Sequence, residues 1–152
     1  KEMKITKEWL KKKSACGDGV EWFFAQSERE STPTLEALIK AEKLDWANWL
    51  IVRVMSRPQC LAYAIFAAEQ VIDIFEDKYP DDKRPRQAIE AAKQVLENDT
   101  ADNRNASTDV AADVAYASAD VAFASSAYAN TREEMLLKIL NYGLGLLKGV
   151  GK

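Results

Sequence analysis

Residues 60–93 read CLAYAIFAAEQVIDIFEDKYPDDKRPRQAIEAAK, which joins the most apolar predicted helix of the chain to its best-marked turn. Pro58 suits a first helical position, because its missing N–H costs nothing there. Tyr79 should end the helix, since the residue before Pro80 is pushed out of the helical region. Between them apolar side chains recur every three or four residues, which predicts one buried helix face: Leu61, Ile65, Ala68, Ile72 and Phe75.

A charged turn, Asp81 to Arg84, follows this helix, and Pro85 can open the next one. Ile89, Ala92 and Leu96 continue the helical spacing. The sequence therefore predicts a central helical hairpin over residues 58–97. It is a helix–turn–helix unit in the architectural sense, with no feature that indicates DNA reading.

Composition favours an all-α protein with one domain. The 152 residues are 47% hydrophobic and 30% charged, with only six Gly and four Pro, which is typical of a compact helical fold. The net charge of −3 gives no general attraction to nucleic acid, so direct nucleic-acid binding is not expected. Charge is uneven, because the first turns are rich in lysine, whereas residues 97–120 carry six acids against Arg104.

Shorter helices are predicted on either side of the hairpin. Thr6 can cap a basic N-terminal helix, Asp18 with Glu21 resembles a capping box, and Asp45 can cap a further helix. Ser31-Thr32-Pro33 marks another start. Trp46 and Trp49 share a helix face, where core packing is favoured over a stacking platform for a ligand.

The C-terminal third changes composition. Residues 100–130 are rich in Ala, Ser and Asp and contain the quasi-repeat DVAYASA–DVAFASS at 113–126. Alanine is the strongest helix former, so a long Ala-rich helix is expected there, followed by a last helix over about 131–148. We therefore expect residues 1–152 to form a single compact bundle of about six or seven helices.

The chain resembles the Imm-5-like family of immunity proteins. The resemblance runs from about Leu44 to the end of the Ala-rich segment and is most specific over 67–93. It is carried by Trp46, Trp49, Leu50, Arg53, Cys60, Tyr63, Ala64, Glu69, Tyr79, Pro80, Asp81, Asp82, Arg84, Pro85 and Arg86. Membership implies an all-α, non-enzymatic protein of polymorphic toxin systems, phages or mobile elements that binds a toxin. Aspartates interrupt the almost pure Ala/Tyr run that is more usual in the family.

No catalytic or metal site is predicted. The chain has no histidine, which removes the commonest general base and zinc ligand. Glu69, Asp73, Glu76 and Asp77 share one side of a helix and could in principle hold magnesium, but a solvated face is favoured. The two cysteines, Cys16 and Cys60, fit reduced, buried thiols. We expect no cofactor.

We predict specific roles for two sets of charged residues. Glu69 lies among apolar neighbours, so we expect a structural ion pair with Arg53, Arg84 or Arg86. On an ideal helix four aspartates fall within about 20° of one line over about 27 Å, and we call them the aspartate strip: Asp102, Asp109, Asp113 and Asp120. The strip is either a solubilising surface or a docking site for a basic partner.

These observations favour a binding protein that neutralises a cognate toxin by covering its active site or substrate groove. One alternative is a phage- or mobile-element-encoded inhibitor of a host defence enzyme. Another is a carboxylate-based metal-binding protein or enzyme. The expected partner is a protein, either basic or nucleic-acid-binding, and a homo-oligomer is compatible with the sequence. No leader or membrane span is recognised, so we expect a cytoplasmic protein with no membrane partner.

Overall fold

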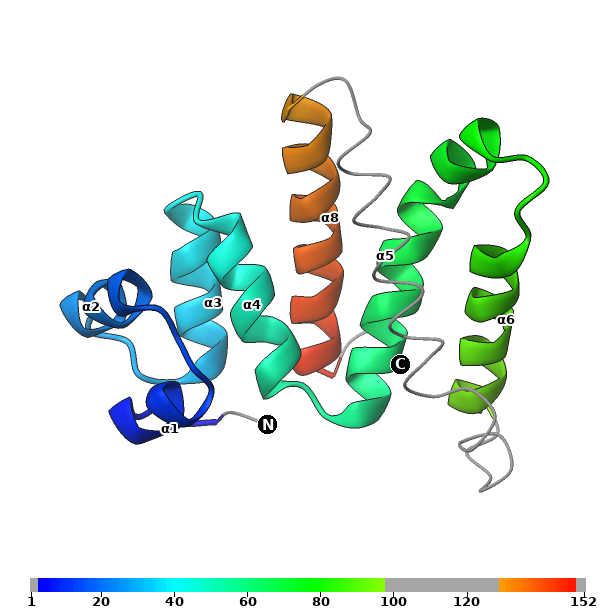
Figure 1. Cartoon of the computed structure of the whole chain (residues 1–152). Coiled ribbons are helices and arrows are strands. Elements are labelled where there is room, and N and C mark those ends of the chain that lie inside the picture. Colours follow the sequence, from blue (N-terminus) through cyan, green and yellow to red (C-terminus); the bar gives the residue numbers. More distant parts are fainter. Residues whose placement is uncertain (1–2, 98–128, 150–152) are drawn as a thin grey trace. The chain divides into compact units, whose positions relative to one another are not determined.

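The computed structural model describes residues 3–97 and 129–149. Within these residues it contains helices and no strand, which confirms the all-α prediction (Figure 1). The helices are α1 (Lys7–Lys12), α2 (Gly17–Ala25), α3 (Ser31–Lys40), α4 (Leu44–Val54), α5 (Arg57–Lys78), α6 (Arg84–Glu97) and α8 (Ala129–Leu147). The Ala-rich helix expected at about 100–130 lies outside the described residues.

The chain divides into two compact units. The first, which we call the N-terminal unit, comprises residues 1–55 and 143–152, and the second, the hairpin unit, comprises residues 56–142. Helix α8 supplies residues to both units. The expectation that residues 1–152 form a single domain stays a prediction.

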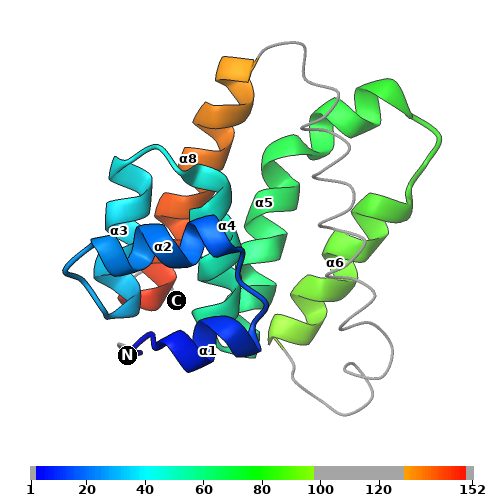
Figure 2. The same cartoon turned by 60° about the vertical axis from the view of Figure 1, so that its left-hand side comes forward.

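In the N-terminal unit α3 and α4 lie side by side (Figure 2). Residues 3–5 are hydrogen-bonded to the segment that leads into α3, because the Ile5 N–H donates to the Arg29 carbonyl and the Ser31 N–H donates to the Met3 carbonyl, both at 2.8 Å. Thr6 caps α1 as predicted, its Oγ1 accepting from the Trp9 N–H at 3.1 Å. Ile5 and Leu35 are among the fully buried residues.

Two predicted caps of this unit are wrong. Helix α2 begins at Gly17 with Cys16 as its N-cap residue, and α4 begins at Leu44 with Lys43 in that role. Neither cap makes a side-chain hydrogen bond. Asp18 and Asp45 instead lie inside the first turns of their helices, where a carboxylate favours the helix through the positive end of its dipole.

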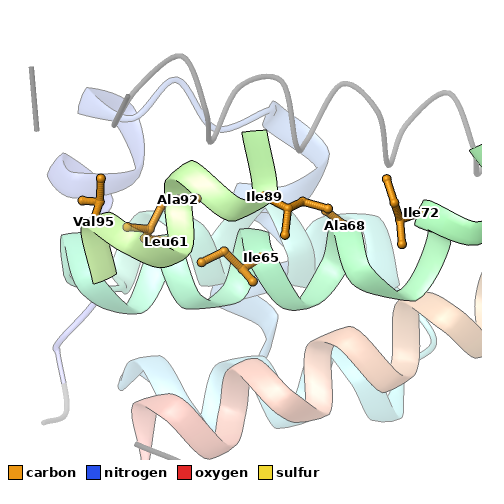
Figure 3. Packing of buried hydrophobic residues seen from close by; sticks show 7 residues of the cluster. All are labelled: Leu61, Ile65, Ala68, Ile72, Ile89, Ala92 and Val95. Carbon is orange, nitrogen blue, oxygen red and sulfur yellow. The ribbon is translucent and has the colours of Figure 1, made fainter. Parts of the chain in front are cut away.

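The hairpin unit contains the predicted helical hairpin, α5 and α6. Ser56 caps α5 in a reciprocal capping box with Gln59, Pro58 lies in its first turn, and Tyr79 is its C-cap residue. Seven buried side chains of the two helices form one apolar cluster (Figure 3): Leu61, Ile65, Ala68, Ile72, Ile89, Ala92 and Val95. On α8, the Tyr142 ring stacks on that of Phe66, with ring centroids 4.0 Å apart.

Removing the Ser56 cap tests how α5 begins. Ser56→Ala should lower the free energy of unfolding by about 1 kcal/mol, because the Gln59 N–H loses its side-chain acceptor. Ser27→Ala is the matched control, since Ser27 is exposed and lies in a bend outside any helix, and it should stay within about 0.5 kcal/mol of the wild type. Urea denaturation measures both variants. Equal effects would show that the capping box contributes nothing to α5.

Candidate functional site

Charged side chains line the outside of the α5–α6 hairpin and cross-link its two helices. The Arg86 guanidinium donates to both Glu76 carboxylate oxygens, with Nε 3.1 Å from Oε2, and this hydrogen bond lowers the pKa of Glu76. Asp73 lies further from the same guanidinium, at 3.8 Å, with a side chain that is 91% exposed. The Glu76–Arg86 pair therefore joins the end of α5 to the start of α6 with bidentate geometry.

The predicted arginine partner of Glu69 is wrong within this hairpin. The Lys93 Nζ lies 2.9 Å from Glu69 Oε2, and the carboxylate raises the pKa of that lysine. Arg84 pairs with Asp82 and Arg86 pairs with Glu76. The Glu69 side chain is also 40% exposed, so the strong desolvation that motivated an arginine partner is absent, and a pair this exposed contributes about 1 kcal/mol or less.

Arg53 belongs to the N-terminal unit, where its guanidinium contacts Trp49 of the same helix, α4. Its Nη1 donates to the Trp49 carbonyl at 2.8 Å, and its guanidinium carbon lies 4.1 Å from the centroid of the Trp49 ring. This hydrogen bond and cation–π contact hold the guanidinium against its own helix.

The turn between the helices is tied by Asp82 and Arg84. The Arg84 side chain donates to both Asp82 carboxylate oxygens, from Nε at 2.9 Å and from Nη2 at 2.7 Å, and its backbone N–H donates at 3.1 Å. These hydrogen bonds lower the pKa of Asp82 to about 2. Since the folded-state pKa is depressed, the stabilisation is complete above pH ~4 and is lost as the pH falls through about 2.

This acid dependence can be tested at one residue. Carboxyl NMR titration should place the pKa of Asp82 at about 2. Arg84→Gln should raise this pKa toward ~3.9, with the backbone N–H of residue 84 still donating to the carboxylate. Lys83→Gln is the control, because it removes a neighbouring positive charge but none of the three hydrogen bonds. An Asp82 pKa that Arg84→Gln leaves unchanged would contradict the turn geometry.

Beside this network lies an exposed acidic surface with one aromatic side chain. Asp73, Asp77 and Asp81 are exposed, and so is Tyr79, at 44%. The Tyr79 ring is held by Phe75, with ring centroids 5.1 Å apart. We call these four residues Asp73, Asp77, Tyr79 and Asp81 the turn surface. The Lys78 ammonium lies 5.7 Å from the centroid of this ring, and the three aspartates belong to the same stretch of chain, residues 73–81. Acidic and aromatic side chains so close in sequence are suited to contact with a basic protein.

The carboxylates of α5 are not arranged as a metal site. In residues 3–97 and 129–149 no group of three or more His, Cys, Asp or Glu side chains could hold an ion. Glu69 and Glu76 are each engaged by a basic residue of α6. Of the helices that the structure describes, none has the length and hydropathy needed to cross a bilayer.

Both cysteines are free thiols, as predicted, but the expected burial is wrong for Cys16, which is exposed. Cys60 is half-buried, and this burial raises the pKa of its thiol. Cys16 precedes α2 at the rim of a cavity that sequence reasoning missed. Trp46 and Trp49 line that cavity and are half-buried. The predicted core packing therefore describes only part of each side chain.

The four residues of the aspartate strip lie outside the described residues, and their role as a docking site stays a prediction. The sequence shows that the acidic residues are concentrated in residues 51–129. Residues 51–129 contain thirteen acids and eight bases, a net charge of −5, whereas the rest of the chain contains eleven acids and thirteen bases, a net charge of +2.

Two family models match the chain. The model described as "Imm-5 like putative immunity protein" matches residues 51–129, and the model described as "YdhT N-terminal domain" matches residues 3–58. No curated protein and no solved structure gives a significant match. The first match spans the α5–α6 hairpin and the acidic part of the sequence, whereas the second spans α1 to α4.

Proposed function

The chain belongs to the Imm-5-like family of immunity proteins, and on that basis we propose that it binds and neutralises a protein toxin. It acts by occupation of a surface rather than by catalysis. The observation that carries this proposal is the match over residues 51–129, which is also the part of the chain with a net charge of −5.

The charge distribution supports a basic partner. A surface with net negative charge raises the rate of encounter with a positively charged protein and disfavours acidic ones. A toxin that acts on nucleic acid carries a basic groove for phosphates. Carboxylates of the immunity protein can stand where those phosphates would lie, so that the bound protein excludes the substrate.

We propose two acidic sets of residues for this contact. The turn surface combines Asp73, Asp77 and Asp81 with the exposed ring of Tyr79. The aspartate strip adds four further carboxylates: Asp102, Asp109, Asp113 and Asp120. We propose the strip as the main electrostatic contact. The turn surface then supplies the aromatic anchor, since tyrosines carry a large share of interface energy.

Affinity capture from the native host lysate tests this function. The tagged full chain should retain one basic toxin at low salt, and that toxin should be released at about 0.5 M salt, where the screening length is below ~5 Å. Capture of a defence enzyme instead would support the phage-borne inhibitor. Retention of a toxin at high salt would contradict the electrostatic contact, and failure to retain any toxin would contradict the function.

A further inference from the structure

The N-terminal unit contains a cavity that the proposed function does not use. Its volume is about 260 Å³, and it is lined by residues of α1, the α1–α2 loop, α2, α3 and α4 and by Ile5. Buried core side chains make up part of its lining, among them Leu10, Leu38 and Leu50, each at most 5% exposed. Every lining residue precedes residue 51, so the cavity lies outside the Imm-5-like match.

Three of the four tryptophans of the chain line this cavity: Trp22, Trp46 and Trp49. All three are half-buried, although tryptophan has more apolar area to remove from water than any other residue. Trp22 meets Trp46 edge-on, with ring centroids 6.4 Å apart and planes at 68°. The cavity therefore has aromatic walls that remain partly open to a ligand.

These walls are held in place before any ligand binds. The Lys43 ammonium lies 4.5 Å from the centroid of the Trp46 ring. Arg53 lies 4.1 Å from the centroid of the Trp49 ring and donates to the Trp49 carbonyl. Cation–π contacts of this kind restrict the motion of the rings. Ligand binding therefore costs less conformational entropy at these side chains.

The lining selects for an uncharged aromatic ligand. Of its polar side chains, Thr34 already donates its hydroxyl to the Glu30 carbonyl at 2.7 Å. The Asp45 carboxylate disfavours an anion, and the Lys43 ammonium over the Trp46 ring disfavours a cation at that wall. An apolar cavity of about 150 Å³ can hold benzene. We propose that this larger cavity binds a neutral small molecule with one to three aromatic rings.

The neutral fluorophore N-phenyl-1-naphthylamine is a direct probe for the full-length protein. It should bind at one saturable site with a Kd of about 1–100 µM, the range given by ordinary ligand efficiency for a molecule of this size. Energy transfer from tryptophan should accompany binding. Absence of saturable binding for this probe and for indole and naphthalene would overturn the proposal.

Two glycines of the same helical turn offer a matched pair of variants. Gly19 lines the cavity, and a Cβ there would lie 3.2 Å from the Cys16 Sγ, an exposed side chain that can turn away. A Cβ on Gly17 would meet nothing within 4 Å. Gly19→Leu should therefore fill the cavity and weaken probe binding about tenfold or more, whereas Gly17→Leu should leave it within about twofold.

A second pair of variants, at tryptophans outside α2, tests the same cavity. Trp49→Ala should weaken the probe about tenfold, whereas Trp9→Ala should not, because Trp9 does not line the cavity. Far-UV circular dichroism and melting temperatures confirm that each variant folds. Equal binding by the members of both pairs would place the probe elsewhere and overturn the proposal. None of these variants touches the acidic surfaces, so toxin capture should be unchanged even if the cavity proposal fails.

Discussion

Ile89→Ala is expected to lower the free energy of unfolding by about 2–5 kcal/mol. The Ile89 side chain is 1% exposed and lies in the cluster between α5 and α6. Its truncation loses the transfer free energy of the buried methyl groups and leaves a cavity that the two helices fill only in part. Since a small protein is stable by only about 5–15 kcal/mol, this loss would leave much of the hairpin population unfolded under mild denaturant.

Leu96→Ala is the matched control for this variant. Leu96 is on the same helix but is 42% exposed, so its truncation should cost about 0.5 kcal/mol or less. Equilibrium denaturation by guanidinium chloride, followed by far-UV circular dichroism, compares the two variants. If Ile89→Ala cost no more than Leu96→Ala, the α5–α6 cluster could not be the core of the hairpin unit.

Asp113→Lys is expected to weaken toxin binding at least about tenfold at low salt. The substitution places a positive charge in the middle of the aspartate strip, where the proposed partner is basic, so attraction becomes repulsion. The difference between variant and wild type should shrink as salt is added, because exposed charges are screened. Titration calorimetry with the captured toxin measures both effects.

The control for this variant must carry the same change in net charge. Asp18→Lys meets that condition at an exposed position of the N-terminal unit, and it should leave the Kd within about twofold if the contact is local. Asp77→Lys separates the two acidic surfaces, since Asp77 belongs to the turn surface. A larger effect from Asp77→Lys than from Asp113→Lys would move the main contact to that turn.

The hairpin could be predicted because its signals are local. Three prolines, Pro58, Pro80 and Pro85, and a regular apolar spacing define α5 and α6, and the structure differs by one residue at the start of each. Its ion pairs also follow a simple rule of position in the sequence. Glu69 and Lys93 both lie twelve residues from Asp81, and Glu76 and Arg86 both lie five residues from it. Antiparallel helices joined by a short turn bring such symmetric positions together.

The predicted partner of Glu69 was wrong because it was chosen from neighbours of the turn and from apparent burial. Neither criterion includes the register of the hairpin. The two capping-box patterns of the sequence also show that a local pattern alone does not identify a contact. Asp18 with Glu21 matches the pattern, but the helix begins at Gly17, whereas the Ser56–Gln59 box is real. The position of the N-cap residue depends on the path of the chain before the helix, and a four-residue sequence pattern does not specify that path.

The aromatic cavity could not be predicted, because its walls come from separate elements. Trp46 and Trp49 share a face of α4 in any helical reading, but Trp22 reaches them from α2. Their half-burial depends on how α2, the α1–α2 loop and α4 meet. Composition alone could have noted that all four tryptophans precede residue 50, which concentrates the aromatic surface of the chain in the N-terminal unit.

Protection of growing cells tests the central claim, neutralisation of a bound toxin, most directly. The captured toxin is expressed in a bacterial host with the wild-type chain, with Asp113→Lys, or with Asp18→Lys. The wild type and Asp18→Lys should restore growth, and Asp113→Lys should protect less at equal protein levels. Growth arrest that persists in the presence of the wild-type chain, although the two proteins bind, would contradict neutralisation.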